Sequence, residues 1–106
     1  MEYNPQNIFA RIISGEIQAE TVLEDSQCIA FKDIAPKAKV HILILPKIAC
    51  MDFEDFLSKE QDSRYFFYFI LKVAEKVGLK DYKLQTNKGA AAGQEIMHFH
   101  MHLLGG

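Results

Sequence analysis

The stretch His98-Phe99-His100-Met101-His102-Leu103-Leu104 decides how this chain folds. Histidines and large apolar residues alternate along it, which is typical of a β-strand that has one face in the core. Because side chains alternate between the two faces of a strand, His98, His100 and His102 are predicted to point to the same side. The sequence therefore predicts a row of titratable imidazoles fixed on a rigid element.

A row of histidines can also belong to an expression tag, to a buried structural set or to a zinc site. A tag does not fit, because tags are contiguous and polar, whereas these histidines alternate with apolar residues. A set of purely structural histidines would need many hydrogen-bond partners in order to be buried. A zinc site that combines two of them with His41 is an alternative, but the outer pair lies about 13 Å apart along a strand, too far for one ion. We expect neither a metal nor a cofactor in the site.

The composition predicts the general class of the protein. The chain has 106 residues, so we expect a single domain over residues 1–106. A hydrophobic share of 49% and a charged share of 25% are ordinary for a soluble globular protein. A net charge of −2 gives no sign of the basic surface that binds a nucleic-acid polymer. The sequence shows no apolar stretch of about 18 residues and no CxxC pair, and we expect no signal peptide before the domain. We therefore expect a cytoplasmic protein with free thiols and no membrane partner.

The first half of the chain predicts one short helix and three strands. Asn7 is a suitable N-cap for an amphipathic helix over residues 8–13. Two short strand-like runs, 21–24 and 28–33, are separated by turn residues and predict a hairpin. The segment 39–45 is apolar on both faces, which indicates a central strand.

The segment Asp52–Val77 contains no glycine or proline, and Asp62 or Ser63 provides a helix cap within it. We expect one long central helix there. Its apolar residues surround the whole helix, whereas a helix packed on one sheet of a small domain buries a single stripe. We therefore expect a homodimer built partly on Tyr65–Val77. The alternative is that these aromatic residues all lie in the core of one chain.

The last part of the chain predicts two paired strands. Residues 82–86 alternate as a strand, and the small-residue loop 87–93 leads directly into the histidine strand. Strands joined by one loop are usually antiparallel neighbours, so the loop should lie beside the imidazoles.

The histidine stretch closely resembles the His-φ-His-φ-His-φ-φ signature of the histidine triad (HIT) superfamily. Further segments resemble its Hint branch: Ile8-Phe9, Gly15-Glu16-Ile17, Ala30-Phe31-Lys32-Asp33-Ile34, His41-Ile42-Leu43-Ile44-Leu45-Pro46-Lys47, Asn87, Gly93-Gln94 and Leu103-Leu104-Gly105-Gly106. The resemblance covers nearly the whole chain as one HIT domain. It implies an α+β fold with an antiparallel sheet of about five strands, one short N-terminal helix and one long central helix. The sheet is expected to continue across a homodimer.

The resemblance also implies an activity, the hydrolysis of the P–N bond in purine nucleoside monophosphate amides such as AMP-amine and AMP-lysine. His100 would be the nucleophile and would form a covalent nucleotidyl-histidine that water then cleaves. His98, His102 and His41 would donate hydrogen bonds to the phosphate and help the leaving amine to acquire its proton, and the acid among them is left open. The alternatives are a nucleotide-binding or scaffold protein without turnover and a dinucleoside polyphosphate hydrolase.

The same resemblance assigns residues around the nucleotide. Asp33 would accept hydrogen bonds from the ribose hydroxyls. The apolar walls of the base pocket would be Ile8, Phe9, Ile17, Phe31, Ile34 and Leu43. The phosphate and the leaving group would be held by Asn87, Gly93, Gln94 and the amide of Glu95 or Ile96. Lys32 and Glu95 stand where many members of the branch carry a histidine and a serine.

Overall fold

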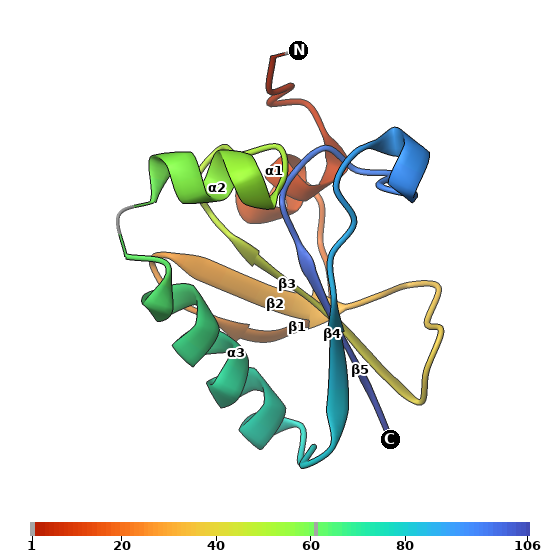
Figure 1. Ribbon diagram of the computed structural model, residues 1–106. Helices are drawn as coiled ribbons and strands as arrows, with labels where there is room; N and C mark the ends of the chain where they lie inside the picture. The colour runs from red at the N-terminus through yellow and green to blue at the C-terminus, as the bar shows by residue number, and fades with distance from the viewer. Residues whose placement is uncertain (1, 61) are drawn as a thin grey trace.

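The computed structural model describes residues 2–60 and 62–106, and its centre is a five-stranded antiparallel sheet (Figure 1). The strand order is β1-β2-β3-β5-β4. The bounds of the strands are Thr21–Glu24 for β1, Cys28–Lys32 for β2, Val40–Pro46 for β3, Tyr82–Gln85 for β4 and Met101–Gly105 for β5. This architecture confirms the expected α+β fold, the hairpin of β1 and β2, and the central place of β3.

The first helix, α1, spans Ile8–Ile13 and begins as predicted. The side chain of Asn7 accepts a hydrogen bond from the backbone N–H of Ala10 at 2.9 Å, which satisfies one of the free donors of the first turn. Phe9 is the buried residue of this helix. The helix therefore presents one aromatic side chain to the sheet.

Two helices, rather than one, lie between β3 and β4. The helix α2 spans Phe53–Lys59, and α3 spans Arg64–Lys76. They are separate because Glu60 is extended, with φ −97° and ψ 120°, and because Asp62 accepts from the N–H of Arg64 at 3.1 Å where the next helix begins. Within the described residues, no helix is long and apolar enough to cross a membrane.

The sheet has a separate apolar cluster on each face. On the α2–α3 face, Ile42 and Ile44 of β3 pack with the phenylalanines of these helices. On the opposite face, Leu43 and Leu45 pack with Phe9 of α1. Neighbouring residues of β3 thus enter opposite clusters, because side chains alternate along a strand. The prediction that this strand is apolar on both faces is confirmed.

The strand β5 begins three residues later than the histidine pattern predicts. Residues 98–100 lie before the ladder, where the N–H of Phe99 donates to the carbonyl of Cys50 at 2.9 Å. The carbonyl of His100 accepts from the hydroxyl of Thr86 at 2.8 Å. These bonds replace strand pairing, so the segment is ordered without belonging to β5. The alternation persists through it, since Phe99 lies in the cluster on the α2–α3 face together with Met101 and Leu103.

Candidate active site

Three of the four histidines meet on the α1 face of the sheet. In the pairing of β3 with β5, Leu43 lies opposite His102 and His41 lies opposite Leu104, so His41 and His102 are diagonal neighbours. Their rings are in direct contact, with His41 Nε2 2.9 Å from His102 Nδ1. The ring centroid of His100 lies 5.0 Å from that of His102. The antiparallel register thus assembles a histidine cluster from two strands that are distant in sequence.

The hydrogen bond of His100 determines which of its nitrogens is free. Its Nδ1 lies 2.6 Å from the backbone carbonyl of His98. A carbonyl only accepts hydrogen bonds, so Nδ1 carries the proton and Nε2 keeps its lone pair. The edge of the ring packs against Phe9, with centroids 4.9 Å apart at 87°. His100 is therefore held in one tautomer, with an unprotonated nitrogen that no hydrogen bond of the described chain occupies.

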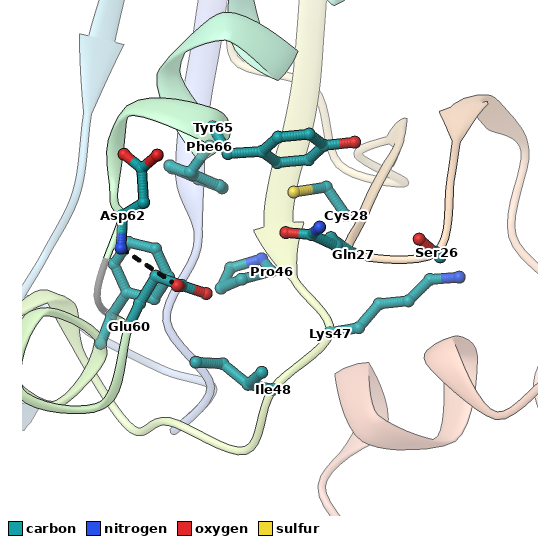
Figure 2. A pocket seen from close by; sticks show the side chains of 11 residues that line it. Ser26, Gln27, Cys28, Pro46, Lys47, Ile48, Glu60, Asp62, Tyr65 and Phe66 are labelled. Atoms are coloured by element: carbon teal, nitrogen blue, oxygen red, sulfur yellow. Dashed lines mark hydrogen bonds between the residues drawn. The ribbon is translucent and has the colours of Figure 1, made fainter.

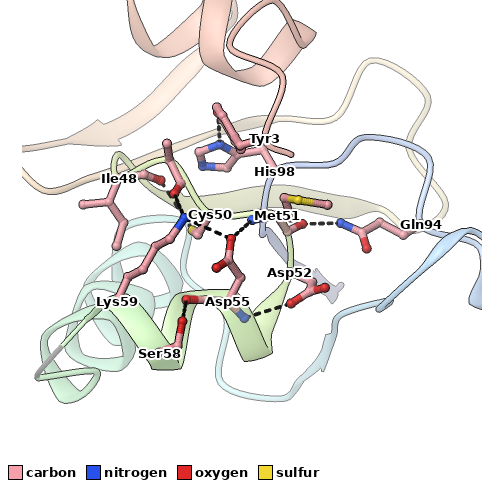
Figure 3. A network of polar contacts seen from close by, with 11 residues as sticks. Tyr3, Ile48, Cys50, Met51, Asp52, Asp55, Ser58, Lys59, Gln94 and His98 are labelled. Carbon is pink, nitrogen blue, oxygen red and sulfur yellow. Dashed lines mark hydrogen bonds and ion pairs between the residues drawn. The ribbon is translucent and has the colours of Figure 1, made fainter. Parts of the chain in front are cut away.

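His98 has a different environment from the other histidines (Figure 3). Its Nε2 donates to the carbonyl of Pro46 at 2.8 Å, and its Nδ1 accepts from the hydroxyl of Tyr3 at 2.7 Å. The side chain is fully buried, with 0% exposure. Both ring nitrogens are occupied by the protein, so in this geometry His98 has no atom left for a phosphate. Its contacts differ from the phosphate-binding role that the resemblance implies.

His41 is fixed by a backbone amide. The N–H of Lys37 donates to His41 Nδ1 at 3.0 Å, so the ring proton lies on Nε2, which faces His102 Nδ1. His102 in turn carries its proton on Nε2. The Asp33 carboxylate lies close to both rings, with Oδ2 3.4 Å from His41 Nε2.

The same three side chains have the spacing of a metal site, because the nearest ligand atoms of Asp33, His41 and His102 all lie within 4.8 Å of one another. A histidine binds a metal through an unprotonated nitrogen. His41 Nε2 carries the ring proton, and its Nδ1 is occupied by the amide of Lys37. A metal ion would have to break that hydrogen bond, so the residues do not fit a metal in the conformation observed.

Burial keeps His98, His100 and His102 neutral near pH 7. Burial lowers the pKa of His98 to about 4. It also lowers the pKa of His102 to about 4, helped by the neighbouring His100 and His41. Burial lowers the pKa of His100 as well, while the nearby Asp33 carboxylate acts in the opposite direction. Each of these three rings therefore offers one N–H donor and one lone pair.

The predicted base-pocket residues divide into two groups. Phe9, Phe31 and Leu43 belong to the buried cluster on the α1 face, and Ile96 packs against the same cluster. Ile17 is half-buried. In contrast, Ile8 is 40% exposed and Ile34 is 98% exposed. The buried group forms an apolar floor beside His100, and the two isoleucines lie open at the surface rather than packed as walls.

The loop before β5 is held by one buried amide. Gln94 is 4% exposed, its Oε1 accepts from the N–H of Gly89 at 2.8 Å, and its Nε2 donates to the carbonyl of Met51 at 2.7 Å (Figure 3). A second bond from Nε2 reaches the carbonyl of Ile96 at 3.1 Å. Because these bonds use both ends of the amide, Gln94 holds the backbone of the loop, and its predicted contact with the phosphate stays a prediction.

The other residues that the sequence predicts around the nucleotide have simpler contacts. Asn87 donates from Nδ2 to the carbonyl of Ala92 at 2.7 Å, which closes the turn that contains the 3₁₀ helix η1, Ala90–Ala92. Gly93 follows with φ +90°, a left-handed conformation that favours glycine. Glu95 is exposed. Lys32, also exposed, forms an ion pair with Glu20.

A cavity of about 310 Å³ lies away from this site (Figure 2). It opens between the β1–β2 turn, the end of β3 and the start of α3, and its floor includes Cys28, Phe56 and Phe66. Among the described residues that line it there is no histidine.

Sequence reasoning did not identify Tyr3, Lys37 or Pro46 as parts of the site. Tyr3 and Pro46 bind the two nitrogens of His98, and Lys37 binds His41. Pro46 and Lys37 act through backbone atoms, for which residue type gives no signal. Tyr3 lies 95 positions from His98, and nothing in the local sequence relates the two.

The fold and the site define a small α+β protein with a buried histidine cluster on one face of an antiparallel sheet. Residues 14–106 match the HIT domain family. The chain belongs to this family.

Relatives and solved structures agree with this assignment. The chain is 47% identical over 108 residues to an uncharacterized HIT-like protein of Rickettsia prowazekii, covering 98% of this chain and 90% of that protein. A HIT family hydrolase from Clostridium thermocellum superposes with a TM-score of 0.89 at 40% identity, covering 97% of this chain and 92% of that one. A histidine triad protein from Clostridium difficile also gives 0.89, at 36% identity, with 100% and 94% covered. These similarities support a hydrolase-like member of the family.

Proposed function

We propose that this protein hydrolyses the P–N bond of purine nucleoside monophosphate amides, of the AMP-amine and AMP-lysine type, through a covalent nucleotidyl-histidine on His100. One observation carries the proposal. The Nδ1–H of His100 is tied to the carbonyl of His98 at 2.6 Å, which leaves Nε2 as an oriented lone pair beside an apolar floor. A neutral imidazole in this state is a competent nucleophile.

In the first step, the lone pair of His100 Nε2 attacks the phosphorus, and the bond between phosphorus and the leaving nitrogen breaks. The leaving nitrogen takes a proton and departs as a neutral amine. His102 is the candidate donor, because its ring centroid lies 5.0 Å from that of His100 and its Nε2 carries a proton while Nδ1 accepts from His41. His98 is excluded from this role here, since both of its nitrogens are engaged. The products of the step are the amine and nucleotidyl-His100.

In the second step, water attacks the phosphorus of the nucleotidyl-histidine. The P–N bond to His100 breaks, and its electron pair returns to Nε2. The water proton restores the proton that the His41–His102 pair gave to the amine. The nucleoside monophosphate then leaves, so the complete cycle consumes one water and returns His100 and the His41–His102 pair to their starting protonation states.

The test uses an adenosine phosphoramidate with a fluorescent amine as leaving group. Wild-type protein should release the amine with and without EDTA, and the His100→Ala variant should be inactive while it still binds AMP in calorimetry. Mass spectrometry of the wild type during turnover should detect a protein species heavier by one adenylyl group. A Glu75→Gln variant, changed at an exposed position of α3 outside the groove of Phe67, Leu71 and Leu84, is the control and should retain full activity.

Three results would contradict the proposal. Loss of activity with EDTA would favour a zinc-dependent enzyme. AMP binding without any turnover would favour a nucleotide-binding or scaffold protein, and cleavage only of dinucleoside polyphosphates would favour that related hydrolase class.

The proposed assembly is a homodimer that uses α3 and the edge strand β4. Phe67, Tyr68 and Leu71 of α3 are 47%, 61% and 54% exposed, and with Leu84 of β4 they line a groove of about 320 Å³. Apolar side chains and an edge strand on one surface are typical of an interface. A second copy of the chain would cover both by a symmetric contact and extend the sheet.

The dimer proposal has a direct test. Light scattering at micromolar concentration should give twice the chain mass for the wild type and the chain mass for Leu71→Glu, because a buried charge in a symmetric contact is repeated on both sides. A wild type of single-chain mass would contradict it.

The buried free thiols Cys28 and Cys50 suit a reducing compartment, and we propose the cytoplasm.

A further inference from the structure

The Asp33 carboxylate is held against the His41–His102 pair. Its Oδ1 accepts from the N–H of Ala35 at 2.8 Å, which forms a tight turn after β2. Its backbone N–H donates to the carbonyl of His41 at 3.0 Å. These two bonds fix the side chain so that Oδ2 lies 3.4 Å from His41 Nε2. The side chain is only 18% exposed, and that of His41 is 2% exposed.

The neutral pair has a complete hydrogen-bond pattern. The amide of Lys37 donates to His41 Nδ1, His41 Nε2 donates to His102 Nδ1, and His102 Nε2 carries the remaining proton. This arrangement has no proton to spare, because removal of the Nε2 proton would leave His102 as an imidazolate. The pair must therefore hold one extra proton before His102 can protonate a leaving amine.

An extra proton creates a conflict that only a further acceptor resolves. It must be placed on His102 Nδ1, because His41 Nδ1 is occupied by the amide of Lys37. Two N–H groups would then face each other across 2.9 Å. The Nε2–H of His41 must turn to another acceptor, and Asp33 Oδ2 is 3.4 Å away. A carboxylate there also balances the positive charge.

Resting on the proposed function, we propose that Asp33 is a positioning residue for the proton donor. Its Oδ2 accepts the His41 Nε2–H when the His41–His102 pair holds the extra proton that the departing amine takes. As the P–N bond of the substrate breaks, His102 Nε2–H passes its proton to the leaving nitrogen, and the pair returns to its neutral pattern. This role is additional to any contact between Asp33 and a ribose.

The charges around His102 agree with this role. Four charged or titratable neighbours act on it, namely His100 on the segment before β5, His41 on β3, Lys37 in the β2–β3 loop, and Asp33 after β2. The first three lower the pKa of His102, as burial does, and Asp33 raises it. Among these neighbours, Asp33 is the group that favours the protonated ring.

The experiment compares two substrates that share the same nucleoside. Adenosine phosphoramidate with an alkylamine needs a proton on its leaving group, whereas the p-nitrophenyl ester of AMP releases a stable anion without one. Asp33→Asn keeps an acceptor for the amide of Ala35 but presents an N–H donor to His41. Because both substrates carry the same ribose, any loss of ribose binding cancels in the ratio of their kcat values.

We expect Asp33→Asn to lower the ratio of the amide kcat to the ester kcat by at least about tenfold, since general acids contribute about 10²–10⁴ in rate. The control is Asp25→Asn at the other end of β2, where the carboxylate also closes a turn and accepts from Gln27 and Cys28. This variant should keep the wild-type ratio. An unchanged ratio in Asp33→Asn overturns the proposal.

A second measurement does not depend on turnover. Nuclear magnetic resonance of the ring protons should place the pKa of His102 lower in Asp33→Asn than in the wild type, by about 1, since an opposite charge a few ångströms away shifts a pKa by about 1–3. An unchanged value overturns the proposal. If the wild type hydrolyses neither substrate, the proposed function fails, and the titration alone decides the role of Asp33.

Discussion

Acidification should destabilise this protein through His98. The ring is fully buried and uses both nitrogens in hydrogen bonds to Tyr3 and Pro46. Burial lowers the pKa of His98 to about 4, whereas an unperturbed histidine has a pKa of 6.5. Between these values the unfolded chain binds the proton and the folded chain does not. Its contribution to stability is therefore complete above pH 6.5 and is lost as the pH falls toward 4.

The size of the effect follows from the two pKa values. One pKa unit corresponds to about 1.4 kcal/mol, so the free energy of unfolding should fall by about 2 kcal/mol between pH 7 and pH 5 because of His98. The carboxylates of Asp25 and Asp55 do not contribute in this range, because hydrogen bonds hold their pKa values below the usual one. His102 adds a further loss by the same reasoning, because burial also lowers its pKa to about 4.

Urea unfolding of the wild type and of His98→Asn at pH 7 and pH 5 measures the effect. The wild type should lose about 2 kcal/mol more than the variant over this interval, because the variant has no group to titrate at this position. Equal losses in the two proteins would refute the reasoning. If the variant does not fold, the titration of the His98 ring in the wild type is measured instead. A midpoint close to that of an unperturbed histidine would also refute the reasoning.

Three further substitutions test the packing and the loop. Phe66→Ala should lower the free energy of unfolding by about 3–5 kcal/mol in urea unfolding, because the ring is 2% exposed and packs against two other buried phenylalanines. Gln94→Leu should cost about 1–3 kcal/mol in thermal unfolding, since the N–H of Gly89 loses its acceptor. Gly105→Ala should lower the thermal midpoint, because the new Cβ would lie 2.9 Å from Leu79 Cδ1. An unchanged thermal midpoint in Gln94→Leu would contradict the hydrogen bond between Gly89 and Gln94, and one in Gly105→Ala would contradict the close approach of Leu79.

Most of the fold could be predicted because its signals are local. The cap at Asn7, the double-faced apolar strand around Ile42 and Leu43, and the alternation before Gly105 each depend on residues close in sequence. The division of the central helical region was missed. Glu60 is extended between α2 and α3 without a glycine or proline to mark the break, so the pattern indicated one helix.

The proximity of four predicted site residues was also accessible from the sequence, but their contacts were not. His41, His100, His102 and Asp33 were predicted together, and the structure brings them together. Gln94 was expected at the phosphate, yet its amide holds the backbone of its own loop.

The sequence by itself determined the alternation of histidines with apolar residues over residues 98–104, the side to which His100 and His102 point and the family to which the chain belongs. These properties follow from residue type and from the two-residue period of a strand. Only the tertiary structure decided the tautomer of each ring, and with it which nitrogen is a donor and which is a nucleophile. The partners that set the tautomers of His98 and His41 are a phenol, a carbonyl and an amide from other segments of the chain. Backbone carbonyls and amides are common to nearly all residues, so only folding determines which of them reaches a given ring.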